Sequence, residues 1–300
     1  MTNFKVWISS FRLRTLPLSI SGILLGSALA YSNQFFNTTI FVFALLTTIS
    51  LQILSNLAND YGDGVKGTDN NNRIGPERAI QSGLISPQQM KYAIIINVLI
   101  LIVLITTLLY FSFGTNEYLN LLVFFLLGIV SIFSAIKYTV GNKAYGYYAL
   151  GDLFVLLFFG FLSVMGSYYL YAKDLEINII LPSFSVGLLS VAVINLNNMR
   201  DLVSDKLSNK ITIAGKLGFN NSKKYHFLIL ISSIVFSILF ILFFYYKPIS
   251  LIVILSYVPI IIHLKKVYCI TKPEHYNNEL KKVAISTFVF SLIHSLIIIM

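Results

Sequence analysis

Charged residues are scarce in this chain of 300 residues. Asp, Glu, Lys and Arg make up 11% of it, and only 12 residues are acidic. A typical soluble domain carries roughly 25% charged residues. Here the hydrophobic fraction is 56% and the mean hydropathy is +0.79, which leaves too few polar side chains to cover a surface in water. An ordinary soluble protein is therefore excluded, and a polytopic membrane protein is predicted.

Cysteine is also nearly absent, because Cys269 is the single one. An intramolecular disulfide framework is thereby excluded. No stretch between the apolar segments is long enough to fold separately, so we expect one transmembrane domain over residues 1–300. The net charge of +10 does not favour nucleic acid as a partner, because the basic residues are spread over loops that membrane insertion alone would make basic.

Long apolar runs are abundant. A bilayer core of about 30 Å requires about 20 apolar residues per helix. Nine segments qualify: 15–32, 37–56, 91–113, 118–137, 148–172, 178–197, 225–246, 249–266 and 282–300. With a cytoplasmic N-terminus, all but two of the 22 Lys and Arg residues, Lys173 and Lys247, fall on the cytoplasmic side. The predicted fold class is an all-α polytopic membrane protein with nine transmembrane helices and the N-terminus in the cytoplasm.

The few acidic residues gather at the ends of two apolar segments, in a repeated pattern. The two copies are Asn56-Leu57-Ala58-Asn59-Asp60 followed by Asp63, and Asn195-Leu196-Asn197-Asn198 followed by Asp201 and Asp205. Residues three and four apart share one face of a helix, so each copy predicts a polar stripe. Carboxylates at membrane depth face a bundle interior or a water-filled cavity. We therefore expect two stripes that face a common cavity on the cytoplasmic side.

Asp and Asn side chains without His or Cys partners are hard oxygen ligands that suit Mg²⁺. Arg73, Arg78, Lys143 and Arg200 are expected on the same cytoplasmic side as these stripes and can hold phosphate groups. Together they predict a site for a diphosphate, and the membrane setting favours a polyprenyl diphosphate. An ion-coupled transporter is the alternative from another class, because intramembrane Asp and Asn also bind Na⁺ or H⁺.

Several stretches resemble the UbiA superfamily of intramembrane aromatic prenyltransferases. Asn59-Asp60-Tyr61-Gly62-Asp63 and Asn198-Met199-Arg200-Asp201-Leu202-Val203-Ser204-Asp205 look like its two Asp-rich motifs. More narrowly, the chain resembles the 1,4-dihydroxy-2-naphthoate polyprenyltransferase (MenA) branch. The stretches that carry this likeness are Gln52 through Asp63 to Arg73-Ile74-Gly75-Pro76, Arg14-Thr15-Leu16-Pro17, Tyr138-Thr139-Val140-Gly141, and Tyr145-Gly146-Tyr147 leading to Leu150-Gly151-Asp152.

The resemblance implies transfer of a polyprenyl chain to 1,4-dihydroxy-2-naphthoate in a bacterial cytoplasmic membrane, with another aromatic acceptor as the nearer alternative. It implies one Mg²⁺ at Asp60 and Asp63 and a second at Asp201 and Asp205. The other implied roles are assistance from Asn56, Asn59 and Asn198, diphosphate contacts from Arg73, Lys143 and Arg200, and stabilisation of the cation by Tyr138. Asp69 departs from the superfamily's spacing, and Lys210 lacks the preceding glycine of many relatives, so both are weaker candidates.

Two further features have competing interpretations. Asp152, near the start of the fifth apolar segment, is either an intramembrane functional carboxylate, which we include among the substrate-binding candidates, or an acid placed for the helix dipole. The aromatic residues around it are expected mostly to face lipid or the membrane interface, with a few lining the path of the cation: Tyr145, Tyr147, Tyr148, Phe158 and Phe159. The pair Gly22 and Gly26 predicts close helix packing.

Overall fold

The computed structural model describes residues 4–68 and 74–300, which are helical apart from connecting loops and one isolated parallel bridge between Tyr148 and Ile211. The α-helices are α1 (Phe4–Phe11), α2 (Leu16–Ser32), α3 (Thr38–Val65), α4 (Pro87–Phe113), α5 (Tyr118–Lys137), α6 (Gly151–Val155), α7 (Ser167–Ala172), α8 (Ile180–Arg200), α9 (Leu202–Leu207), α10 (Ile213–Phe244), α11 (Ile254–Cys269) and α12 (Tyr276–Ile299). A π-helix, η3 (Leu156–Gly166), continues α6 into α7. The short 3₁₀ turns are η1 (Leu13–Thr15), η2 (Tyr145–Tyr147), η4 (Ile177–Ile179), η5 (Pro248–Val253) and η6 (Pro273–His275).

Nine helical stretches in the described part of the chain are long and apolar enough to cross a membrane, so the predicted count is confirmed. The fourth span, Tyr118–Lys137, has the predicted bounds, whereas α3 continues to Val65 and α10 begins at Ile213. In α3, backbone hydrogen bonding carries the helix onward through polar residues after the apolar run has ended. In α10, a kink at Gly218 (φ 73°, ψ 171°) separates the first turns from the apolar part of the helix. The first acidic motif therefore lies on a helix, as its spacing predicts.

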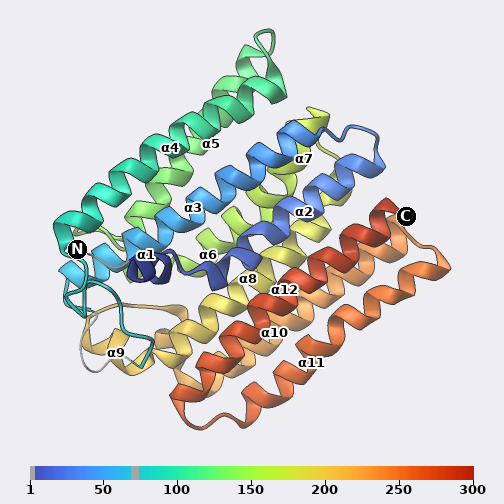
Figure 1. The fold of residues 1–300 in the computed structure, drawn as a ribbon. Helices are drawn as coiled ribbons and strands as arrows, with labels where there is room; N and C mark the ends of the chain where they lie inside the picture. The colour runs from blue at the N-terminus through green and yellow to red at the C-terminus, as the bar shows by residue number, and fades with distance from the viewer. Residues whose placement is uncertain (1–3, 69–73) are drawn as a thin grey trace.

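The helices form a bundle in which α2, α3 and α8 are central (Figure 1). The hairpin of α4 and α5 lies on one side and packs against α3, whereas α10 packs against α8 on the other side. The last helix, α12, packs against both α2 and α8, so helices from the two ends of the sequence lie side by side, although the two termini lie at opposite ends of the bundle. The C-terminal ends of α3 and α8 consequently lie at the same end of the bundle.

Close packing without large side chains joins α2 to η3 and α7. A Cβ atom on Gly22 would lie 2.1 Å from Ser163 Oγ, and one on Gly26 would lie 2.0 Å from Ser167 Oγ. Neither position has room for a side chain, so the close packing predicted for this glycine pair is confirmed. These contacts fix η3, which forms one wall of the site described below.

Two interruptions of helix geometry lie at the end of the bundle that carries the acidic motifs. Between α1 and α2, Arg12 has φ 50° and ψ 54°, in the left-handed region. Between α8 and α9, Asp201 has φ −93° and ψ 11°, which ends one helix and starts the next. Both interruptions place charged side chains at the site.

Candidate active site

The last two turns of α3 present the first motif. Asp60 and Asp63 are buried, and both line a large cavity together with the half-buried Asn59. Asp60 Oδ1 accepts a hydrogen bond from the Arg12 guanidinium, and Arg78 Nε lies 3.5 Å from the same oxygen. Arg78 also donates from Nη1 to Asp63 Oδ2 at 2.7 Å. Each carboxylate of this motif is thus paired with arginine.

The second motif lies across the break between α8 and α9. Arg200 donates to both oxygens of Asp201, at 2.8 Å from Nε and 2.5 Å from Nη2, and also to Asn197 Oδ1 at 2.6 Å. Asp205 is paired with Lys210, whose Nζ is 3.2 Å from Asp205 Oδ1. The break at Asp201 alters the predicted stripe, because Asn197 lines the cavity and Asn198 does not.

The two motifs meet. A small polar cavity is lined by acidic residues of both, Asp63 from α3 with Asp201 and Asp205 from the α8–α9 region, and by Arg78, Lys210 and Asn197. These residues are up to 147 positions apart in the sequence, yet they surround one space. Carboxylates, cations and amides at this junction form the polar head of the site.

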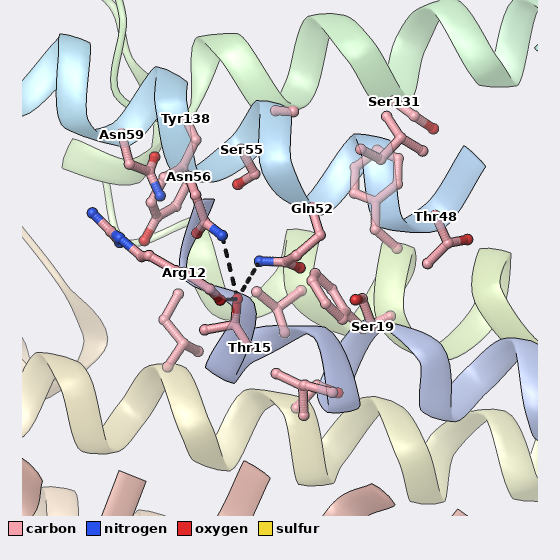
Figure 2. Close-up of a pocket in the computed structure, with 18 of the residues that line it drawn as sticks. Arg12, Thr15, Ser19, Thr48, Gln52, Ser55, Asn56, Asn59, Ser131 and Tyr138 are labelled. Atoms are coloured by element: carbon pink, nitrogen blue, oxygen red, sulfur yellow. Dashed lines mark hydrogen bonds between the residues drawn. The ribbon is translucent and has the colours of Figure 1, made fainter. Parts of the chain in front are cut away.

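A larger cavity of about 660 Å³ extends from this polar head into the bundle. Its polar end includes Tyr138 and the residues at the α1–α2 interruption, and Figure 2 shows Arg12, Thr15, Gln52 and Asn56 gathered there. Its other walls are mainly apolar, with a few serine and threonine side chains. The large apolar residues of α4, α5, η3 and α7 that line it are Ile105, Leu108, Leu109, Phe124, Leu127, Phe158, Phe159, Leu162 and Leu170. The cavity therefore suits a molecule with an anionic head and a hydrocarbon tail.

The expected orientation of the aromatic residues is wrong for most of them. Tyr145, Phe158 and Phe159 line the large cavity, and the Tyr147 hydroxyl donates to Asp63 Oδ1 at 2.8 Å. Only Tyr148 is exposed, at 55%. The π-helix and the turn at η2 direct these side chains inward, and hydropathy alone does not register such local geometry.

Burial and charge govern the ionisable groups that lie outside the membrane spans. Burial raises the pKa of Asp205, although Lys210 opposes this shift. Burial by itself would lower the pKa of Lys210, but the nearby Asp205 and Asp63 outweigh it and the pKa is raised. Burial raises the pKa of Tyr138 to about 12 and also raises that of Tyr147, where the charge of Asp63 adds to the effect. Both tyrosines therefore remain protonated donors at neutral pH.

Several predicted site residues either lie away from the cavity walls or make other contacts there. Lys143 is exposed in the loop after α5. Asp152 is buried behind the wall and accepts a hydrogen bond from the Tyr225 hydroxyl at 3.0 Å. Asn56 lines the cavity, but its amide donates to Phe11 O and Thr15 Oγ1. Arg73, like Asp69, lies outside the described residues.

Sequence reasoning underrated or missed three residues. Lys210, the weaker candidate, lies between the two motifs, and neither Arg12 nor Tyr147 was selected. The signal for both was present, because Tyr147 lies in the family-like stretch before Asp152 and Arg12 lies two residues before Arg14-Thr15. Their partners are 48 and 84 positions distant, and only the fold reveals them.

The oxygen atoms of the site fit Mg²⁺. Within residues 4–68 and 74–300, no three Asp, Glu, His or Cys side chains form a ready-made metal cluster. Mg²⁺ usually takes only one or two carboxylates together with substrate phosphates, so such a cluster is not required. Asp205, which lines the small cavity, has a buried Oδ2 without a hydrogen-bond partner, and a buried oxygen of this kind favours a cation.

Several known proteins are similar to this chain in sequence. The family model described as the UbiA prenyltransferase family matches residues 19–292. The chain belongs to the UbiA prenyltransferase family. It is 46% identical to 1,4-dihydroxy-2-naphthoate octaprenyltransferase of Escherichia coli K12, over 80% of this chain and 77% of that protein. It is 45% identical to the protein of the same description from Haemophilus influenzae, over 75% and 73% of the two chains.

A solved structure supports the fold of this UbiA family member. The structure of a UbiA homolog from Archaeoglobus fulgidus bound to DMAPP and Mg²⁺ matches with a TM-score of 0.62 at 16% identity, and the match covers 95% of this chain and 98% of that one. The predicted all-α fold and the predicted superfamily are confirmed. The chain is a multi-pass membrane prenyltransferase, and the transporter alternative gains no support.

Proposed function

We propose that this enzyme transfers a polyprenyl chain from a polyprenyl diphosphate to 1,4-dihydroxy-2-naphthoate in the bacterial cytoplasmic membrane, on the route to menaquinone. The observation that carries the proposal is the meeting of both acidic motifs at the polar head of one amphipathic cavity. The identity of 45–46% to two 1,4-dihydroxy-2-naphthoate octaprenyltransferases supports the choice of acceptor.

The polar head would receive the diphosphate. Asp60 and Asp63 on one side, and Asp201 and Asp205 on the other, would hold Mg²⁺ ions. When bound, Mg²⁺ neutralises the negative charge that develops on the leaving diphosphate. Arg200 holds Asp201 in place through its two hydrogen bonds, whose guanidinium geometry matches a carboxylate.

The remaining basic residues of the head would contact the diphosphate directly. Arg78 and Lys210 both line the small cavity between the motifs. Their charges stabilise a developing anion most strongly where water is excluded. Lys143 and Arg73 remain predictions for the same role.

The reaction breaks the C1–O bond of the polyprenyl diphosphate, and the diphosphate leaves with the electron pair. The allylic cation then bonds to the ring carbon that bears the carboxylate. Loss of that carboxylate as CO₂ returns an electron pair to the ring and gives demethylmenaquinol, the reduced form of demethylmenaquinone. Tyr138 lines the cavity, and its ring face would steady the cation. The apolar walls hold the tail and keep water from the cation.

The test uses membranes that contain the protein, supplied with polyprenyl diphosphate, Mg²⁺ and either 1,4-dihydroxy-2-naphthoate or 4-hydroxybenzoate. We expect a prenylated naphthoquinone by mass spectrometry, with release of CO₂ and diphosphate, and no product from 4-hydroxybenzoate. EDTA and Asp60→Asn should each abolish product formation, whereas Asp174→Asn, on an exposed loop, should not. A prenylated hydroxybenzoate would refute the acceptor, and turnover that survives EDTA would refute the metal assignment.

A further inference from the structure

The interruption between α1 and α2 is held in a fixed shape by α3. Asn56 Nδ2 donates to Phe11 O at 2.9 Å, and both Asn56 and Gln52 donate to Thr15 Oγ1 at 3.2 Å. The Thr15 hydroxyl in turn donates to Arg12 O at 2.8 Å. Figure 2 shows the two hydrogen bonds from Asn56 and Gln52 to Thr15. Together these contacts surround Arg12, whose left-handed conformation is unfavourable for arginine. Strain that neighbouring contacts maintain in this way is typical of functional positions.

The result of this arrangement is the direction of the Arg12 side chain. It lines the large cavity, and its Nη2 donates to Asp60 Oδ1. The Asp60 side chain is only 2% exposed, whereas that of Arg12 is 19% exposed. A buried carboxylate requires a cation as a partner, and here the cation is the Arg12 guanidinium. It contacts the same carboxylate to which Mg²⁺ would bind in the proposed function.

We propose that Arg12 changes partner during each reaction cycle. It pairs with Asp60 before substrate arrives, and it moves to the diphosphate of the polyprenyl substrate when a divalent cation takes its place on Asp60. This inference rests on the proposed function and adds to it a substrate-binding residue from the start of the chain.

Three features favour the exchange. A cation bound to Asp60 would repel the Arg12 guanidinium. Because Arg12 is partly buried at the cavity wall, its charge would then need another anion as a partner. The diphosphate arrives at that wall, and guanidinium binds phosphate oxygens in a bidentate manner. Arg78 lies 3.5 Å from the same oxygen of Asp60, so the carboxylate keeps one basic neighbour after Arg12 departs. Divalent cation and diphosphate should consequently bind cooperatively, because each removes a competitor for the other.

The test measures binding without acceptor, so that no turnover is needed. Full-length protein in detergent is titrated with Mn²⁺ alone by electron paramagnetic resonance, and then with polyprenyl diphosphate in the presence of Mn²⁺ by calorimetry. The variant is Arg12→Asn, because asparagine tolerates the left-handed conformation. We expect Mn²⁺ alone to bind severalfold more tightly to the variant, and polyprenyl diphosphate to bind about tenfold more weakly, through the loss of a charge-assisted contact.

Two further variants separate the exchange from simpler effects. Arg14→Asn removes the same charge two residues away. The Arg14 side chain also lines the large cavity, but it is exposed and has no ion pair to either acidic motif among the described residues, so it controls for the local charge alone. This variant should leave Mn²⁺ binding unchanged. Arg12→Lys keeps the charge, and we expect it to restore Mn²⁺ affinity to the wild-type value while diphosphate affinity stays reduced.

The outcomes distinguish the alternatives. Weaker binding of both ligands to Arg12→Asn would assign Arg12 a merely structural role and overturn the exchange. An equal rise in Mn²⁺ affinity in Arg12→Asn and Arg14→Asn would overturn it too, because bulk charge would then be the cause. Wild-type protein that binds no Mn²⁺ would refute the metal site of the proposed function. If wild-type protein binds Mn²⁺ and Arg12→Asn has the same affinities for Mn²⁺ and polyprenyl diphosphate as wild type, the exchange alone would be refuted.

Discussion

Replacing Tyr147 with phenylalanine tests whether this tyrosine positions the first acidic motif. Its hydroxyl donates to Asp63 Oδ1 at 2.8 Å and lies 2.7 Å from Thr68 Oγ1. The Tyr147 pKa is raised by burial and by the Asp63 charge, so the hydroxyl remains a donor over the pH range in which the enzyme is assayed. A hydrogen bond to a charged group contributes about 1.5–3 kcal/mol. Tyr147→Phe should therefore lower kcat/KM for polyprenyl diphosphate by roughly 10-fold to 150-fold.

The assay is prenylated naphthoquinone formation at saturating acceptor, measured over a range of Mg²⁺ concentrations. The deficit should be equal at about pH 7 and about pH 9, because the hydroxyl does not titrate between them. Thr68→Val is the matched control, since it removes the neighbouring hydroxyl but leaves the Tyr147 donor to Asp63, and it should cost less than about tenfold. A loss below about threefold in Tyr147→Phe, or a larger loss in Thr68→Val, would refute this positioning role.

Three other perturbations have defined outcomes. Lys210→Gln leaves its buried partner Asp205 without this cation and should lower the free energy of unfolding by about 3 kcal/mol. Mg²⁺ should raise the unfolding midpoint of this variant more than that of wild type. The control Lys206→Gln, at an exposed position, should change neither the stability nor its response to Mg²⁺. Gly26→Ala places a Cβ atom 2.4 Å from a backbone oxygen and should lower the free energy of unfolding by about 1–3 kcal/mol. The control Gly128→Ala meets only the flexible side chain of Ile105 at 3.0 Å, so it should lower the melting temperature clearly less in the same experiment. Glu279→Gln weakens hydrogen bonds to a buried histidine and to a lysine, and it should lower the melting temperature without altering the KM for polyprenyl diphosphate, a result that a shift in KM would contradict.

Local sequence was sufficient for the helices because membrane insertion depends on the hydropathy of each segment by itself. Nine apolar runs gave nine spans, and the fourth was located to the residue. The end of α3 was placed too early in the sequence, since helical hydrogen bonding continues into polar residues as far as Val65. The extra turns at the start of α10 have another origin, because a kink at Gly218 separates them from the apolar part of that helix. The orientation of the bundle across the membrane stays a prediction from the charge distribution.

The acidic residues of the site were also accessible from the sequence. A membrane protein with so few carboxylates rarely places them at matched positions without a use, and helix periodicity put Asn59, Asp60 and Asp63 on one side of α3. The same reasoning chose Asn198 over Asn197, because it assumed a continuous helix through Asp201. In the structure α8 ends at Arg200, and it is Asn197 that lines the cavity.

The sequence by itself therefore determined the membrane class, the number of spans, the two acidic motifs and the family resemblance, all of which depend on the local order of residues. Only the tertiary structure decided which side chains complete the site. Arg12 reaches Asp60 because α3 holds a strained break in the first span, and Tyr147 reaches Asp63 because the loop after α5 folds over the end of α3. Such pairs join segments that are distant in the chain, and burial supplies the low dielectric that makes them strong.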